Sequence, residues 1–275
     1  MNKLPLQKRV QIINLLVEGN SLRSTSRIAD VSINTVTKLL VDVGRACEKF
    51  HDETVKGITA KRVQCDEIWS FVYSKQKNVP EGMEDYAGDV WTWVGIDADT
   101  KLVVSWHVGQ RDAYAAHEFM QDVKARLANK VQLTTDGLRA YLDAIGSHFG
   151  ADIDFAQLVK LYGGESGNSK QERKYSPTEY IGAKKTIVSG QPDEKHISTS
   201  YVERQNLTMR MHMRRFTRLT NAFSKKVDNH CHAIALHFVY YNFVKIHKSL
   251  RVPPAMQAGL IKRLMSIEDI VKLAD

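Results

Sequence analysis

Apolar residues recur at helical spacing near the start of the chain and at strand spacing from about residue 62 onward. Helical spacing from Leu6 to Val17, ending before Gly19, predicts a first helix. Ser21 and Ser32 stand where side-chain oxygens cap helix starts. The N-terminal segment is therefore predicted to contain three short helices, at residues 6–17, 22–29 and 33–43.

A helix, a short turn and a second helix that opens with Ser-x-Asn-Thr are typical of a helix-turn-helix. In that motif the second helix enters the DNA major groove by its N-terminal end. An ordinary three-helix packing unit is the alternative, but the polar and basic exposed positions favour DNA binding. The residues predicted to face DNA bases are Asn34, Thr35 and Lys38, and those predicted to reach phosphates are Arg23 and Arg27.

The middle of the chain alternates between strand and helix patterns. A long strand from Arg62 to Tyr73 is followed by two apolar runs around Asp97-Ala98-Asp99-Thr100, which indicate a hairpin. Further elements are predicted as helix 112–127, strand 131–135, helix 138–149 and a fifth strand at 155–161. This order predicts an α/β fold of the ribonuclease H-like kind: a mixed five-stranded sheet with flanking helices, preceded by an all-α helix-turn-helix domain.

The last third of the chain begins with a polar stretch, residues 163–199, which is rich in turn-forming residues and has no sustained periodicity. We predict a flexible, partly basic insertion, which either meets nucleic acid or is a plain solvated loop. Helices follow from Ser200 to Met213 and from Lys226 to Lys245, and a short one opens at Ser266. The predicted domains are residues 1–55 (helix-turn-helix), 56–250 (catalytic core) and 251–275 (C-terminal helical tail).

Composition narrows the class of partner. The 275 residues carry a formal net charge of +8, which favours an anionic partner, most often nucleic acid. A basic protein without a polyanion ligand is the alternative. The three cysteines are scattered, which argues against a disulfide framework and a zinc ribbon. His230-Cys231-His232 lacks partners at ligand spacing. Without a secretory segment or a membrane-length apolar run, we expect a soluble cytoplasmic protein with no membrane partner.

Three acidic residues carry the candidate chemistry: Asp66, Asp136 and Glu203. The first two end or interrupt strand-like runs, and the third opens a helix rich in arginine. In a ribonuclease H-like layout, the two strand carboxylates lie side by side and the helix brings the third across from them. Carboxylates are the ligands that Mg²⁺ prefers, and two such ions assist in-line phosphoryl transfer. Asp66, Asp136 and Glu203 are therefore the predicted catalytic and metal-binding residues.

Each acid has an alternative. Glu67 is the neighbouring candidate for the role of Asp66, although it falls on the apolar-rich side of its strand. Asp136 precedes a predicted helix and is able to cap it, and Glu203 is able to form surface pairs with arginines. Asp97 and Asp99 lie between two strands and are interpreted as turn residues.

Basic residues surround Glu203. Arg210 and Arg214 follow it by seven and eleven positions, which places all three on one stripe of a helix with about 3.6 residues per turn. Together with Arg204 they form a basic patch predicted to hold the DNA backbone at the site.

Several blocks resemble the insertion-sequence-1 family of bacterial DDE transposases. They are Asp66-Glu67-Ile68-Trp69, Thr135-Asp136-Gly137, Tyr201-Val202-Glu203-Arg204-Gln205-Asn206-Leu207 and Phe223-Ser224-Lys225-Lys226. The late His247-Lys248-Ser249-Leu250 segment is similar to the end of integrase-type cores. The resemblance covers about residues 60 to 260, without the Cys-rich zinc segment that many members carry.

This resemblance implies an RNase H-like core with Asp66, Asp136 and Glu203 as the acidic triad. It implies two Mg²⁺ ions, with Mn²⁺ as a substitute, and double-stranded DNA partners at transposon ends and target. A homo-oligomer, dimeric or larger, is expected because two ends are cut together. We expect such an enzyme to associate with the bacterial nucleoid. A nuclease that cuts without joining and a non-catalytic DNA-binding regulator are the alternatives.

Overall fold

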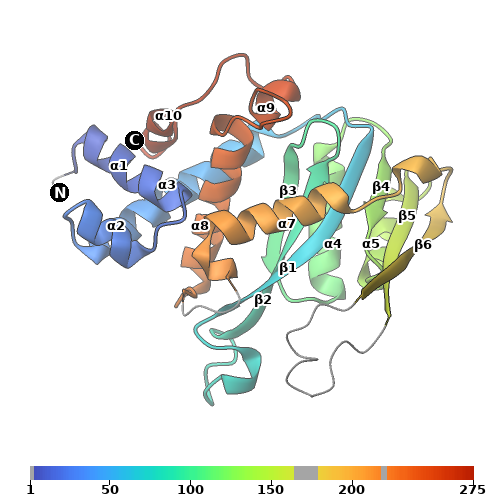
Figure 1. Ribbon diagram of the computed structural model, residues 1–275, viewed down its shortest axis with the longest axis horizontal. Coiled ribbons are helices and arrows are strands. Elements are labelled where there is room, and N and C mark those ends of the chain that lie inside the picture. Colours follow the sequence, from blue (N-terminus) through green and yellow to red (C-terminus); the bar gives the residue numbers. More distant parts are fainter. Residues whose placement is uncertain (1–2, 164–178, 218–221) are drawn as a thin grey trace.

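A six-stranded mixed sheet forms the centre of the molecule in the computed structural model, which describes residues 3–163, 179–217 and 222–275 (Figure 1). The strand order is β3-β2-β1-β4-β5-β6. The strands are β1 (Arg62–Val72), β2 (Gly88–Asp97), β3 (Val103–Gly109), β4 (Gln132–Thr135), β5 (Asp154–Gly163) and β6 (Glu179–Ser189). This mixed α/β arrangement is compatible with the expected ribonuclease H-like fold.

The sheet combines antiparallel and parallel pairings. β1 pairs antiparallel with β2, and β2 with β3, which confirms the predicted hairpin. β1 and β4 are parallel, as are β4 and β5. The prediction of five strands was wrong, because β6 lies within the expected insertion and pairs antiparallel with β5. Residues 164–178 of that insertion lie outside the described residues.

Helices cover both faces of the sheet. Helices α4 (Ala113–Arg126) and α5 (Ala140–Phe149) pack on one face, and α7 (Ser200–His212) crosses the other. Helix α8 (Val227–Val239) continues into one π-helical turn, Tyr240–Val244, beside α7. Alternation along β1 separates the two faces: Val63 and Cys65 join the core under α4 and α5, whereas Ile68 joins the apolar cluster under α7 and α8.

The N-terminal segment forms the three predicted helices, α1 (Leu6–Val17), α2 (Leu22–Ile28) and α3 (Ile33–Thr54). Their caps are as predicted: the Ser21 hydroxyl accepts the Ser24 N–H, and the Ser32 hydroxyl accepts the Asn34 N–H. Helix α3 is longer than the predicted 33–43. Its extension packs along α8, and its apolar residues belong to the same core as the sheet.

The crossing of α3 and α8 depends on Gly44. A Cβ atom at this position would lie 2.5 Å from both the Cβ and the carbonyl oxygen of His232. Since Cβ atoms do not approach other atoms so closely, only glycine permits this contact. The two helices are therefore held at a short, fixed separation.

The C-terminal tail returns to the N-terminal helices. Helices α9 (Pro254–Gln257) and α10 (Ile267–Lys272) close the chain, and α10 packs against α1. Ser266 and Asp269 form a capping box at the start of α10, as the sequence position of Ser266 predicted. No helix in the described part of the chain is long and apolar enough to cross a membrane.

Buried histidines predict acid sensitivity. His237 is 3% exposed, and neither ring nitrogen has a hydrogen-bond partner in the described residues. Burial, and then the nearby His212 and Lys245, lower its pKa to about 3. An unfolded chain binds a proton near pH 6.5, so between pH 6.5 and 3 the unfolded state holds more protons. Stability is thus complete above about pH 6.5 and falls as pH decreases.

We expect His237→Leu to reduce this pH dependence by about 1.4 kcal/mol per pH unit between the two pKa values, because one titrating group is removed. Urea unfolding at pH 7 and pH 5 measures the effect. His196→Gln, which changes an exposed histidine, serves as the matched control. An unchanged pH slope in His237→Leu would refute the burial argument.

Candidate metal centre

Two adjacent parallel strands bring the candidate acids together. Cys65 of β1 is opposite Thr135 of β4, so Asp66 and Asp136 each follow the last paired residue of the same register. Gly137 lets the chain leave β4 close to β5, because a Cβ there would lie 2.7 Å from the Val159 side chain. The sequence Asp136-Gly137 therefore places a carboxylate at the strand end and then turns away.

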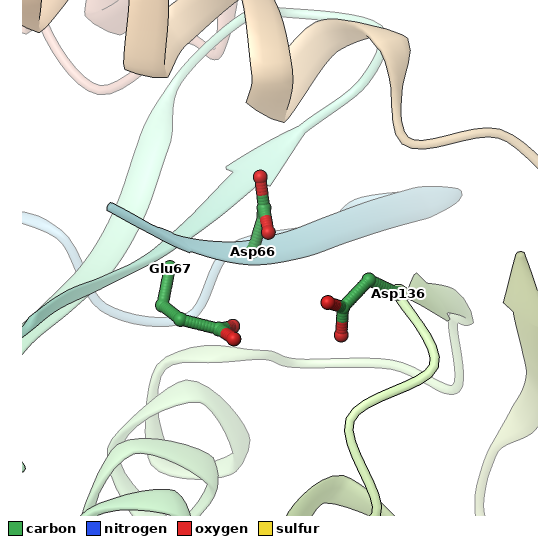
Figure 2. A group of neighbouring side chains, drawn as sticks. All are labelled: Asp66, Glu67 and Asp136. Atoms are coloured by element: carbon green, nitrogen blue, oxygen red, sulfur yellow. The ribbon is translucent and has the colours of Figure 1, made fainter. Parts of the chain in front are cut away.

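Asp66, Glu67 and Asp136 form the group with metal-ligand geometry found among the described residues. Each offers a carboxylate oxygen, and these oxygens lie within 4.8 Å of one another. Figure 2 shows Asp66 on the α7 side of β1, Glu67 on the opposite side and Asp136 beside them at the end of β4. The structure thus brings together two of the three predicted ligands, with Glu67 as the third acid of the group.

Asp66 is partly buried and accepts a hydrogen bond from Asn206 Nδ2 of α7 at 2.9 Å. Burial first, and then the negative charges of Glu67 and Asp136, raise the pKa of Asp66 to about 7. Three carboxylates gathered in this way repel one another. A bound divalent cation would relieve that repulsion, so the donor set fits a hard cation such as Mg²⁺.

Glu67 is held by protein groups on the α4 and α5 side. Its carboxylate accepts hydrogen bonds from Arg111 at 2.7 Å and from the Tyr141 hydroxyl at 3.1 Å, and its side chain is 1% exposed. Burial and then Asp136 raise its pKa, against the lowering effect of Arg111. The Arg111 guanidinium also lies 3.6 Å from Asp136, so one cation bridges two of the acids.

Asp136 is partly exposed, with 34% of its side chain accessible to solvent. Its carboxylate accepts the Leu138 N–H at 2.9 Å. The capping alternative for this residue is not borne out: helix α5 begins at Ala140, and Arg139 stands at its N-cap. The hydrogen bond to Leu138 shapes the loop after β4 and leaves the carboxylate beside Asp66.

Glu203 lies in the first turn of α7 but outside the 4.8 Å group. One carboxylate oxygen pairs with Lys160 of β5, and the other accepts the Thr199 hydroxyl at 2.7 Å. Its negative charge still contributes to the raised pKa of Asp66. Its role as a third metal ligand stays a prediction.

Helix α7 is fixed to β1 by polar contacts that the sequence did not reveal. Gln64 Oε1 accepts the backbone N–H groups of Tyr201 at 2.8 Å and Val202 at 3.3 Å, which are unsatisfied donors at a helix start. Asn206, one turn after Glu203, adds the hydrogen bond to Asp66. Gln64 and Asp66 are two positions apart on a strand, so their side chains point to the same face, which is the α7 face. This spacing was the sequence signal that could have predicted a contact between Gln64 and α7.

The predicted DNA contacts occupy two regions. Arg23, Arg27, Asn34 and Lys38 are exposed on α2 and α3, Thr35 is half-buried, and Lys38 pairs with Asp42. A cleft of about 1020 Å³ separates these helices from the end of α7, and both Arg23 and Asn34 line it. Arg214 lines the same cleft, so three of the predicted DNA contacts face a common hollow.

Near the metal centre, Arg204 is exposed and Arg210 half-buried on α7. The prediction that Arg214 shares one helical stripe with Glu203 and Arg210 was wrong. Helix α7 ends at His212, and Arg214 begins a separate 3₁₀ turn, Arg214–Phe216. A helical projection does not apply beyond the last helical residue.

The interpretation of Asp97 and Asp99 as turn residues is confirmed. The Asp97 carboxylate accepts the Asp99 N–H and the Thr100 hydroxyl, and Asp99 pairs with Arg62. His230 is buried and hydrogen-bonds Ser70, and the metal-ligand group found in the described residues does not include it.

Comparisons with known proteins identify no family: the chain matches no protein-family model and no curated protein at a significant level. The assignment of a function to the site therefore rests on the geometry described above.

Removing the guanidinium group of Arg111, which lies beside Glu67, should destabilise the fold. We expect Arg111→Met to lower the free energy of unfolding at pH 7 by about 2 kcal/mol, because it leaves a buried carboxylate without its charged partner. Solvent screens the partly exposed Arg111, which keeps the loss below that of a fully buried ion pair. The same change in a Glu67→Gln background should cost less, since the amide is neutral. Lys130→Met, which breaks a more exposed pair with Asp154, is the control. Equal losses in both backgrounds would contradict the assigned pairing.

The raised pKa of Asp66 predicts a pH profile for metal binding. A protonated carboxyl is a poor ligand, so protons compete with the cation below about pH 7. We expect Mn²⁺ affinity, measured calorimetrically on the metal-free protein, to rise by up to about tenfold per pH unit below pH 7 and to level off above it. Asp66→Asn should remove this profile. A flat profile in the unaltered protein would argue against Asp66 as a ligand.

Proposed function

We propose that the protein is a metal-dependent DNA transposase of the DDE type, with a ribonuclease H-like core. The observation that carries the proposal is the convergence of Asp66 and Asp136 from two adjacent parallel strands, within 4.8 Å of Glu67. Strand order, basic net charge and the sequence blocks that resemble insertion-sequence-1 transposases support it.

The proposed reaction consists of two phosphoryl transfers. Water first cuts at the element end, and the freed 3′-hydroxyl then attacks a target phosphodiester. Mg²⁺, when bound, supplies Lewis-acid activation of the attacking oxygen and stabilisation of the leaving oxygen. Since both steps exchange oxygen nucleophiles at phosphorus, no covalent protein intermediate is required.

The residues have separate roles in this proposal. Asp66 and Asp136 hold the metal, and Asn206 orients Asp66 through its hydrogen bond. Glu67 is saturated by Arg111 and Tyr141, so we assign it a positioning role. Glu203 becomes a ligand when DNA or metal draws it from Lys160. The exposed Arg204 contacts the phosphate backbone.

DNA recognition is assigned to the N-terminal helices. The start of α3 presents Asn34 and Lys38 at the surface, and Arg23 and Arg27 of α2 lie beside it in the motif. Terminal repeats of the element are the proposed target. Two ends are joined in one reaction, so a dimer or a larger assembly of the chain is proposed.

A strand-transfer assay tests the function, with Mg²⁺ and duplex DNA taken from both flanks of the gene. We expect joined product from the unaltered protein and a loss of at least about 100-fold in Asp136→Asn, because a metal ligand is removed. Glu203→Gln should show a similar loss if that carboxylate enters the site. Asp143→Asn, a neutralised exposed aspartate on α5, should keep full activity.

Each outcome of this assay separates one alternative. Cleavage without joining would support a nuclease in place of a transposase. DNA binding without cleavage in any variant would support a non-catalytic regulator and overturn both enzymatic functions. Full activity in Asp136→Asn would reject the carboxylate site itself.

A further inference from the structure

A second pocket lies beside α7. It has a volume of about 370 Å³ and is lined by α7, the turn between β2 and β3, and the segment that follows the π-helical turn. Its polar and cationic lining residues are Lys101, Tyr201, Arg204, Gln205, Thr208, His212, Tyr241, Lys245, His247, Lys248 and Ser249. No carboxylate belongs to this described lining, so the pocket carries a concentrated positive charge.

The cations of the pocket form no ion pair with a carboxylate in the described part of the chain, although the charge of Glu18 acts on Lys245. Within the described ranges, neither Lys101, Arg204, Lys245 nor Lys248 forms an ion pair with an acidic side chain. Lys101 lies over the Tyr201 ring, 3.1 Å from its centroid, which holds the ammonium at the rim. Lys245 contacts the His212 ring at 2.6 Å.

Gln205 supplies an independent observation. It is 2% exposed, it lines the pocket, and its Nε2 donor has no hydrogen-bond partner in the part of the chain that the structure describes. Burying an amide donor without an acceptor is costly. An acceptor placed in the pocket would satisfy this donor, which indicates a ligand with hydrogen-bond-accepting oxygens.

His247 reports the electrostatic potential at the same place. Its pKa is lowered by burial first and then by the charges of Lys101, Lys245 and Arg204. The three cations therefore converge on one region of the pocket. A site that combines convergent cations, a buried amide donor and hydroxyl groups has the chemistry that binds phosphate.

We propose that this pocket binds a backbone phosphate of a nucleic acid strand whose neighbouring phosphodiester lies at the carboxylate group. The adjacency of Gln205 and Asn206 on α7 supports this arrangement, since the first lines the pocket and the second contacts Asp66. The inference rests on the proposed function for the identity of the strand. It goes beyond that function by assigning Lys101, Gln205, Lys245 and Lys248 to the strand's path.

Binding measured without metal tests the pocket apart from catalysis. The probe is a fluorescein-labelled duplex, followed by anisotropy in EDTA over a series of salt concentrations. We expect Arg204→Gln and Lys248→Gln each to weaken binding by about 3- to 10-fold and to reduce the salt slope by about 1. Lys262→Gln, which removes an exposed cation of the C-terminal segment, should change affinity less than about twofold. Affinities equal to this control would overturn the proposal.

Gln205→Met separates a binding role from a structural one. The free variant should unfold at the same temperature as the unaltered protein or slightly higher, because the unpaired donor is gone. Its duplex affinity should nevertheless fall, and the duplex should raise the His247 pKa less than in the unaltered protein. Unchanged affinity together with a lower unfolding temperature would assign Gln205 a purely structural role and reject the site.

A competition experiment with inorganic phosphate distinguishes a site for the phosphate of a nucleic acid strand from a site for a free phosphate anion. We expect it to compete with the duplex only weakly, because one free anion replaces only one of the contacts that a strand makes. Tight calorimetric binding of inorganic phosphate, lost in Arg204→Gln while duplex affinity is kept, would identify a free-anion site and overturn the nucleic acid assignment. If Asp136→Asn retains strand transfer but the pocket variants still lose duplex binding, the proposed catalytic function fails and the phosphate pocket stands.

Discussion

The parallel pairing of β1 with β4 is the constraint on which the candidate site depends. Only four residue pairs join these strands, yet their register places Asp66 and Asp136 side by side, each one residue after the last pair. β1 and β4 run in the same direction and are paired in register, so the residue that follows the last pair on each strand lies beside its counterpart. The proximity of Asp66 and Asp136 is thus a consequence of backbone hydrogen bonding. The free-energy cost of their mutual repulsion is offset by the rest of the fold.

The negative charge of the acidic group is compensated on one face of the sheet and not on the other. Toward α4 and α5, Arg111 and Tyr141 satisfy Glu67, so that side is neutralised within the protein. Toward α7, the Asp66 carboxylate accepts a hydrogen bond from the neutral side-chain amide of Asn206. This bond orients the carboxylate without cancelling its charge. The negative potential is therefore left on the α7 face, where Glu203 and the basic residues of that helix are located.

Local pattern was sufficient for the elements and for one pair of acids. Alternation defined β1 and the hairpin, and the position of Asp136 after a short strand placed it beside Asp66. Glu67 was correctly put on the apolar side, but its partner Arg111 is 44 positions away, and no local spacing reveals such a contact. The pairing of Glu203 with Lys160 was missed for the same reason.

Two errors have physical causes of another kind. β6 lacks alternation because it is an edge strand with apolar residues exposed, among them Tyr180 and Ile187, so backbone pairing with β5 defines it. The α3 helix extends past Val43 because its second half is stabilised by packing on α8. Tertiary contacts of this kind override local signals for where an element ends.

The close crossing at Gly44 has a consequence for how the N-terminal helices can act. A helical unit joined to a core by a loose linker would search for its ligand independently. Here α3 runs without interruption from its exposed start to its contact with His232, so its first turn is carried at a set distance from the sheet. The length of one continuous helix therefore sets the position of Asn34 relative to the carboxylates of Asp66, Glu67 and Asp136.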